Sequence, residues 1–358
     1  MLCGEGFEHR KQWIEDRLQT LSGCFAVSVC GFAVMDNHLH VLVRLDADTV
    51  NSWSAEEVVR RWMTAYPRRS ATGEDLGVSQ AWIDDQTKDE ARVTLLRARL
   101  ANLGWFMKAL KEPLARLANK EDECRGTFWE SRYKSIAVLD EEALLATCAY
   151  IDLNPVAAGI ATAPETSPHT SVQQRVEHAA AQGKLAELKT AAGGSVAGSQ
   201  AAGDVEEGLW LCPIEDRRRQ GAQREGLLEG FSLGSYLLLV DYTSRLCRAG
   251  KARISREVAS ILERLGTSAE VWDSGSGSCL RRRVCWAATS ARIASGCAKL
   301  PSSVACIISI IWSHHLPEGS RRLLSPRVTF LAARSWRRRD DGVHFVGRTF
   351  GPPRANLV

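Results

Sequence analysis

The sequence predicts an α+β fold, in which helices flank an antiparallel β-sheet. Near the start of the chain, Ile14, Leu18 and Leu21 lie on one face of a predicted helix. Two strand-like runs follow, "CFAVSVCGFAV" and "HLHVLVRL", and the turn-prone "MDN" joins them as antiparallel neighbours. Further helical patterns stand on both sides of a third strand-like run.

The elements are predicted in chain order from spacing and end signals. The first helix covers residues 8–22 and ends before Gly23. After the paired strands, helices are expected at 51–66 and 93–119, with a charged, irregular insert between them. The run "GTFWESRYKSIAVL" is expected to be a strand. Asp140 then caps a helix that ends at Asn154, since the residue before a proline avoids the α region.

Composition divides the chain into four segments. Residues 1–175 form the predicted main domain, and 176–225 are a linker rich in Ala and Gly. A small helical module is expected at 226–273. The tail 274–358 carries 13 Arg, one Lys and three acidic residues, a balance of +11 that leaves −7 for the rest. Its weak periodicity is typical of a disordered or out-of-frame tail, and bulk charge does not predict nucleic-acid binding by the main body.

Several protein classes are disfavoured by the composition. The chain has 358 residues, 45% of them hydrophobic, but no run of 18 apolar residues and no secretory signal. We therefore expect a cytoplasmic protein without a membrane partner. Its 11 cysteines include no C-x-x-C pair, so neither a disulfide framework nor a ribbon-type zinc site is predicted.

The first candidate site is a pair of histidines on the second strand. Because side chains alternate along a strand, His38 and His40 share one face, while the apolar set beginning with Leu39 faces the core. Two adjacent imidazoles on a rigid strand can hold a divalent metal ion. A pair of surface histidines on a half-exposed strand explains the spacing equally well.

A second candidate lies in "AYIDLNPVAAG". Tyr150 and Asn154 are four residues apart on a predicted helix and therefore share one face. The phenol is a candidate nucleophile, and the amide oxygen is a candidate third metal ligand. A helical tyrosine taken alone is more often a packing residue.

Together, "MDNHLH", "GTFWESRYKS" and "YIDLNPVAAG" resemble the HUH single-tyrosine transposases, specifically the REP-associated tyrosine transposases of bacteria. The resemblance runs from about residue 3 to 175 and continues more loosely through "YLLLVDYTSRLCRAGKARI". It implies a ferredoxin-like antiparallel sheet and a DNA transposase or endonuclease that acts on single-stranded DNA with hairpins. It also implies a monomer or homodimer as the active form.

The resemblance also implies a role for each site residue. His38, His40 and Asn154 would hold Mg²⁺ or Mn²⁺, and Tyr150 would form a 5′-phosphotyrosine link. Arg132 and Lys134 are candidate phosphate contacts, and Trp129 or Phe128 is a candidate base-stacking surface. Solvated charges and a core aromatic residue explain this last group equally well.

The family's first strand, which lies in the middle of its sheet, is absent from this sequence. We therefore expect a sheet that lacks its first strand, in a domain truncated at its N-terminus. This departure favours one alternative, a DNA-hairpin-binding relative that no longer cuts. A minor alternative is an unrelated metallohydrolase, although the other histidines show no further ligand pattern.

Overall fold

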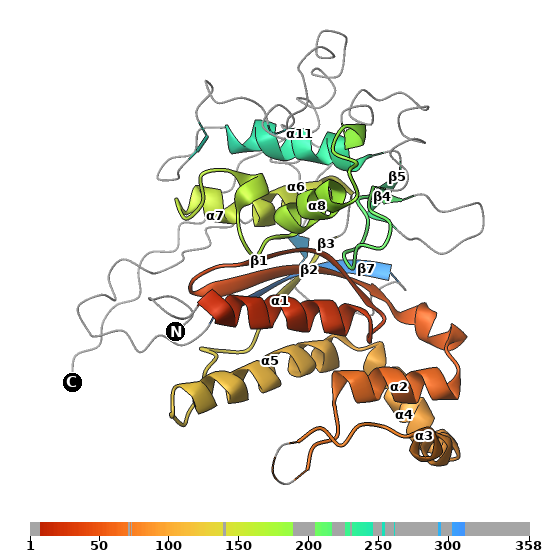
Figure 1. Cartoon of the computed structure of the whole chain (residues 1–358). Helices are drawn as coiled ribbons and strands as arrows, with labels where there is room; N and C mark the ends of the chain where they lie inside the picture. The colour runs from red at the N-terminus through yellow and green to blue at the C-terminus, as the bar shows by residue number, and fades with distance from the viewer. Residues whose placement is uncertain are drawn as a thin grey trace, which may run out of the picture. The chain divides into compact units, whose positions relative to one another are not determined.

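In the computed structural model of this protein, a central antiparallel sheet separates two layers of helices (Figure 1). The structure describes residues 8–70, 72, 74–138, 141–188, 205–216, 226–229, 231–245, 253–254, 261, 293–294 and 303–311. All of them belong to the first of two compact units, which covers residues 1–315.

The helices of the described chain include two short 3-10 turns, η1 and η2. In chain order, the helices are α1 (Glu8–Ser22), η1 (Ala47–Ser52), α2 (Ala55–Ala65), α3 (Gln80–Thr87), α4 (Glu90–Leu100), α5 (Leu103–Glu121), α6 (Glu141–Asp152), α7 (Asn154–Ala157), η2 (Pro164–Thr166), α8 (Ser171–Ala181) and α11 (Leu233–Ser244).

The main sheet has the strand order β1-β2-β7-β3-β6, and each neighbouring pair is antiparallel. Its strands are β1 (Val27–Val34), β2 (His38–Asp46), β3 (Lys134–Val138), β6 (Ile293–Ala294) and β7 (Ser303–Ile311). A separate parallel pair consists of β4 (Glu215–Asp216) and β5 (Leu228–Glu229). The predicted α+β class with a helix-flanked antiparallel sheet is confirmed.

Local sequence explains where most helices begin. Six helices start after a residue whose side-chain oxygen accepts a hydrogen bond from a backbone N–H of the first turn. These caps are Ser54, Ser79, Asp89, Asn102, Thr170 and Ser232. The cap at Asn102 divides the predicted helix 93–119 into α4 and α5. The cap at Ser79 begins α3 inside the insert that was expected to be irregular.

Each face of the sheet has its own hydrophobic cluster. On one face, Leu39, Val41 and Val43 pack with the apolar sides of α1, α2, α4 and α5. On the other, Leu42 packs with side chains of α6, α8 and α11. Figure 1 shows these two groups of helices on opposite sides of the sheet. We call them the apolar face and the histidine face, because His38 and His40 share the face of Leu42.

The C-terminal tail supplies a strand that the sequence did not predict. Residues 274–358 were expected to form an irregular tail and the sheet to lack a strand, but β7 lies between β2 and β3. Ile308 and Ile310 are buried on the apolar face, and Ile307 is buried on the histidine face. The run "SVACIISII" is apolar at nearly every position because a central strand is covered on both sides.

Two other predicted segments also contain ordered parts. Within the predicted linker 176–225, α8 continues to Ala181, and residues 205–216 contribute Leu211, Cys212 and Ile214 to the core. From the predicted module 226–273, α11 packs on α6. Residues 189–204, 217–225 and most of 246–273 lie outside the described residues.

Candidate active site

The two histidines lie at the start of β2, with their rings in contact. The ring centroids of His38 and His40 are 4.6 Å apart, and the rings meet edge to face at 76°. His38 is half-buried, whereas only 4% of His40 is exposed. The alternative of two surface histidines on a half-exposed strand is therefore wrong for His40, because α6 covers β1 and β2 on this side.

Helix α6 brings Tyr150 onto the same face. The centroid of its ring is 5.6 Å from that of His40, and the planes are inclined by 63°. Tyr150 is 36% exposed, so it forms the boundary between the buried His40 and solvent. The structure thus brings together the two motifs that the sequence separates by more than 100 residues.

Hydrogen bonds engage the same ring nitrogen in both histidines. Nδ1 of His38 is 2.6 Å from Oδ1 of Asn37, and Nδ1 of His40 is 2.9 Å from the hydroxyl of Ser309 on β7. In a neutral imidazole, the partner of one nitrogen determines which nitrogen carries the lone pair. The Asn37 oxygen only accepts, so Nδ1 of His38 donates and its Nε2 carries the lone pair. The Ser309 hydroxyl can donate or accept, so it orients the ring of His40 without determining its tautomer.

The buried environment keeps His40 uncharged at neutral pH. Desolvation, together with a smaller effect of the neighbouring His38, lowers the pKa of His40 to about 3. A neutral imidazole is the form that coordinates metal ions. Burial therefore makes His40 suitable as a ligand and unsuitable as a general acid near pH 7.

Asn154 begins α7, one helical turn after Tyr150. Its side-chain nitrogen Nδ2 is buried and has no hydrogen-bond partner among the residues that the structure describes. Such an unsatisfied amide is costly, and the oxygen and nitrogen of an amide side chain exchange places by a flip. If the Asn154 amide is flipped, Oδ1 takes the place of Nδ2, and a metal ion bound to Oδ1 would satisfy it.

Two imidazoles and one amide oxygen are donor types that a divalent metal ion accepts, and His38, His40 and Asn154 would supply them. Within the described ranges, no three side chains of the His, Cys, Asp and Glu types form a cluster that could hold a metal. Any metal at this site would therefore depend on Asn154 and on water in addition to His38 and His40.

Lys134 lies on the histidine face, two strands from His40. Ser309 is the register partner of both His40 on β2 and Lys134 on β3, so the three side chains form one row across the sheet. Neighbouring strands are about 4.8 Å apart, which places Lys134 about 10 Å from His40 across the sheet. Lys134 is exposed and can contact an anion bound near Tyr150.

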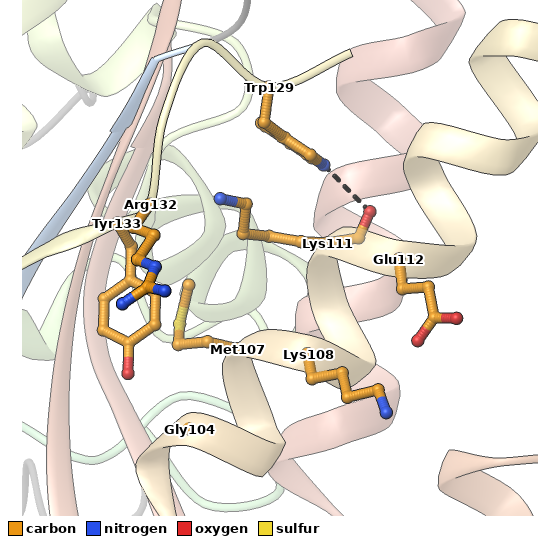
Figure 2. A pocket seen from close by; sticks show the side chains of 8 residues that line it. All are labelled: Gly104, Met107, Lys108, Lys111, Glu112, Trp129, Arg132 and Tyr133. Carbon is orange, nitrogen blue, oxygen red and sulfur yellow. Dashed lines mark hydrogen bonds between the residues drawn. The ribbon is translucent and has the colours of Figure 1, made fainter. Parts of the chain in front are cut away.

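Trp129 and Arg132 do not join this site. Together with Tyr133 and side chains of α5, they line a groove on the apolar-face side of the sheet (Figure 2). Phe128 is buried there, and its ring meets that of Trp129 edge to face at 87°. The structure therefore divides the predicted DNA-contacting residues between the two sides of the sheet.

A buried polar network fixes α6 above the histidines. The hydroxyls of Ser171 on α8 and Tyr236 on α11 both donate to the carboxylate of Asp152. The Ser171 contact is 2.5 Å, and the backbone N–H of Val172 donates to the same carboxylate at 3.1 Å. Burial raises the pKa of Asp152, and these hydrogen bonds act in the opposite direction. The network orients the helix that carries Tyr150.

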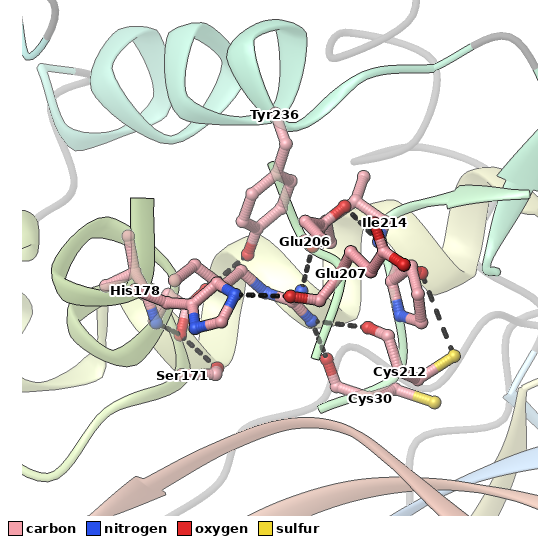
Figure 3. Close-up of polar contacts among 12 residues, drawn as sticks. Cys30, Ser171, His178, Glu206, Glu207, Cys212, Ile214 and Tyr236 are labelled. Atoms are coloured by element: carbon pink, nitrogen blue, oxygen red, sulfur yellow. Dashed lines mark hydrogen bonds and ion pairs between the residues drawn. The ribbon is translucent and has the colours of Figure 1, made fainter. Parts of the chain in front are cut away.

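Arg175 extends this network to residues 205–216. Its guanidinium is almost fully buried, donates to the carbonyls of Cys30 and Cys212 at 3.0 and 2.8 Å, and pairs with Glu206. Figure 3 shows Cys30, Cys212 and Glu206 around this point. Sequence reasoning missed Arg175 and Tyr236, since no local pattern identifies the partner of a polar residue on another helix.

No protein-family model, curated protein or solved structure matches this chain with significant similarity. Among the described helices, none is both long and apolar enough to span a membrane.

Proposed function

We propose that this protein is a metal-dependent DNA endonuclease or transposase of the HUH single-tyrosine type, acting on single-stranded DNA that carries hairpins. The observation that supports it best is the contact between His40 and Tyr150, with ring centroids 5.6 Å apart. In this mechanism a metal-binding pair and a nucleophile must reach the same phosphate, and the proximity of the two rings supports such an arrangement. The ferredoxin-like topology of that family is part of the proposal.

In the proposed reaction, the Tyr150 oxygen attacks the phosphorus of a phosphodiester. A new bond forms between this oxygen and phosphorus, and the bond to the 3′-oxygen breaks. The phenolic proton passes to solvent, and the leaving 3′-oxygen takes a proton from solvent. The products are a 5′-phosphotyrosine and a free 3′-hydroxyl. Because the phosphodiester is conserved in the link, another 3′-hydroxyl can reverse the step and join new ends without ATP.

The residues around Tyr150 hold the substrate for this attack. His38, His40 and Asn154 would bind Mg²⁺ or Mn²⁺, which supplies a Lewis acid for a phosphate oxygen. Lys134 contacts a phosphate beside the cleaved one, from the same face of the sheet. Ser309 holds the ring of His40 in one orientation.

A second candidate function is hairpin binding without cleavage. The 4% exposure of His40 favours it, because a buried ring is less accessible to an entering metal ion. Both functions require the same single-stranded DNA. They differ in whether a covalent link to the protein is formed.

Covalent trapping tests the proposal. The full chain is incubated with end-labelled hairpin oligonucleotides and Mg²⁺ or Mn²⁺, then denatured and separated by electrophoresis. We expect a labelled protein band with the hairpins and none with a blunt duplex. We expect His40→Ala to lose the band and His9→Ala, remote on α1, to keep it. Hairpin binding without any band would support the second candidate instead.

A further inference from the structure

A shallow groove on the apolar-face side of the sheet combines aromatic and cationic side chains. It encloses about 330 Å³ between α5 and the segment that leads into β3 (Figure 2). Its walls contain Trp129, Tyr133 and Met107, and three basic side chains surround them. This volume is within the usual range for sites that bind small organic groups.

The charge of the groove is positive. Lys108, Lys111 and Arg132 line it, and none of them forms an ion pair with a described acidic residue. The one acid in the lining, Glu112, pairs with Arg116 at 2.6 Å. No described acidic residue neutralises the three cations, and the Lys108 ammonium lies 4.8 Å from the centroid of the Trp105 ring.

The aromatic wall is held in place by the chain itself. The indole N–H of Trp129 donates to the carbonyl of Lys111 at 2.9 Å, and the ammonium of Lys111 lies 5.2 Å from the Trp129 ring centroid. That ammonium also donates to the carbonyl of Ser131 at 3.0 Å. A fixed ring beside cations is the combination that binds stacked bases and their phosphates in single-strand-binding proteins.

The groove and the histidine face are linked through neighbouring residues of the chain. Arg132 and Tyr133 line the groove, and the next residue, Lys134, lies on the histidine face. The start of β3 thus joins two groove residues to a cation of the histidine face.

We propose that this groove binds one unpaired nucleotide of the single-stranded DNA, with its base against Trp129 and Tyr133 and its phosphates on Lys108, Lys111 and Arg132. The identity of the ligand as DNA rests on the proposed function. The groove therefore holds a nucleotide on the strand that leads to Tyr150, on the opposite side of the sheet from the cleaved phosphate.

Binding measurements with a matched pair of oligonucleotides test the groove directly. The full chain carries Tyr150→Phe, so that no covalent product forms, and anisotropy reports the affinity for a labelled single strand. The second oligonucleotide has the same length and charge but contains abasic sites. Trp129→Leu is expected to weaken binding of the first by about 5- to 100-fold, the usual loss when a stacking ring is removed.

A mutant cycle separates base stacking from general loss of binding. Removing the base and removing the Trp129 ring should each weaken binding, and doing both should cost no more than either alone. Arg132→Gln and Lys108→Gln, both exposed, should each reduce the slope of log affinity against log salt by about 0.7. Lys120→Gln, an equal charge change farther along α5, should leave affinity for the unmodified strand within about two-fold.

The outcomes distinguish this inference from the proposed function. If adducts form at Tyr150 but the groove variants bind like Lys120→Gln, the groove inference is overturned and the proposed function stands. If single-stranded DNA does not bind at all, both are overturned. If the effects of base removal and Trp129→Leu on affinity are additive, the base does not stack on Trp129. If polyglutamate competes with the labelled strand as well as unlabelled DNA does, the groove is a site for anions and not for a nucleotide. Thermal unfolding of Arg132→Gln verifies that its fold is intact.

Discussion

On the apolar face of the sheet, Leu39, Val41 and Val43 are buried among other apolar side chains, whereas on the opposite face His40 and Arg44 are buried beside Leu42. Buried polar groups are costly unless they are hydrogen-bonded. His40 accordingly has Ser309 as a partner, and Arg44 pairs with Asp46 at 2.9 Å. The two faces of one strand thus differ in what their burial requires.

This difference indicates where function is expected. The apolar face needs only complementary shapes, and its contribution to stability comes from burial. The histidine face needs specific polar partners from β7, α8 and α11. Such buried hydrogen bonds add little to the stability of a core, but they orient the side chains that make them. Variants that disturb one face and spare the other therefore test whether the two faces have these separate roles.

The largest effect is expected from removal of β7, which belongs to both faces. Replacing residues 303–311 with a Gly/Ser segment of equal length would open the middle of the sheet and unpair the neighbouring edges of β2 and β3. We expect loss of cooperative unfolding in circular dichroism. A cooperative transition within a few degrees of the original would show that β7 does not hold the sheet together.

A large effect confined to the apolar face is expected from Ile308→Ala. Ile308 is fully buried there, so the cavity should lower the free energy of unfolding by about 2–5 kcal/mol. Denaturant unfolding measures it, and adduct formation should persist below the new transition. Leu117→Ala, 43% exposed on α5, is the control and should change stability by about 0.5 kcal/mol or less. Equal losses in the two variants would contradict the burial of β7.

A smaller effect, confined to the histidine face, is expected from Ser309→Ala. The hydroxyl orients the ring of His40, and loss of such a partner typically costs about 10- to 100-fold in metal affinity. Titration with Mn²⁺ measures it, while unfolding should change little. Ser309→Thr, which keeps a hydroxyl, should retain most of the affinity. Ser135→Ala, at an exposed position of β3, should bind Mn²⁺ like the parent chain, and a loss there would refute the specific role of Ser309.

The smallest effect is expected from the ion pairs between α1 and the C-terminal end of α5, in the layer of helices that covers the apolar face. Arg10 is buried and donates to Asp122, and this hydrogen bond lowers the pKa of the Asp122 carboxyl. A carboxyl with a lowered pKa stabilises the fold above its unfolded pKa of about 3.9, and this contribution is lost as pH falls through the folded pKa. Asp122 is partly exposed, so we expect about 1 kcal/mol.

Denaturant unfolding between pH 2 and pH 6 tests this pair. Asp122→Asn should be less stable than the parent chain above about pH 4, and the difference should shrink toward pH 2. Asp85→Asn, whose carboxylate is 67% exposed in its pair with Lys88, should show no such difference. If the difference in unfolding free energy between Asp122→Asn and the parent stays constant with pH, the ion pair is not the cause of that difference.

Local patterns predicted many elements of the fold, including the strand that carries His40 and the helix that carries Tyr150. The periodicity of residues 8–22 gives α1, the alternating runs give β1 and β2, and the helical pattern before Pro155 gives α6. These features depend on residues close together in sequence. They follow from the 3.6-residue and two-residue periods alone.

The rest depends on contacts between distant segments. Alternation shows that His38 and His40 share a face, but it does not show that α6 covers this face and buries His40. Strand β7 pairs with β2 across more than 250 residues, and the Arg- and Ser-rich sequence around it hides its apolar run. Strand alternation would place Arg132 on the face of Lys134, but β3 begins only at Lys134 and Arg132 lines the groove with Trp129.

Peptide mapping of the trapped complex tests the central claim most directly. The full chain is linked to a labelled hairpin oligonucleotide, digested with protease, and the nucleotide-bearing peptide is sequenced by mass spectrometry. We predict that the nucleotide is attached to Tyr150, that Tyr150→Phe gives no adduct, and that Tyr133→Phe and Tyr66→Phe keep it. Attachment to Tyr133, Tyr66 or any other residue would contradict the assignment of the histidine face as the active site.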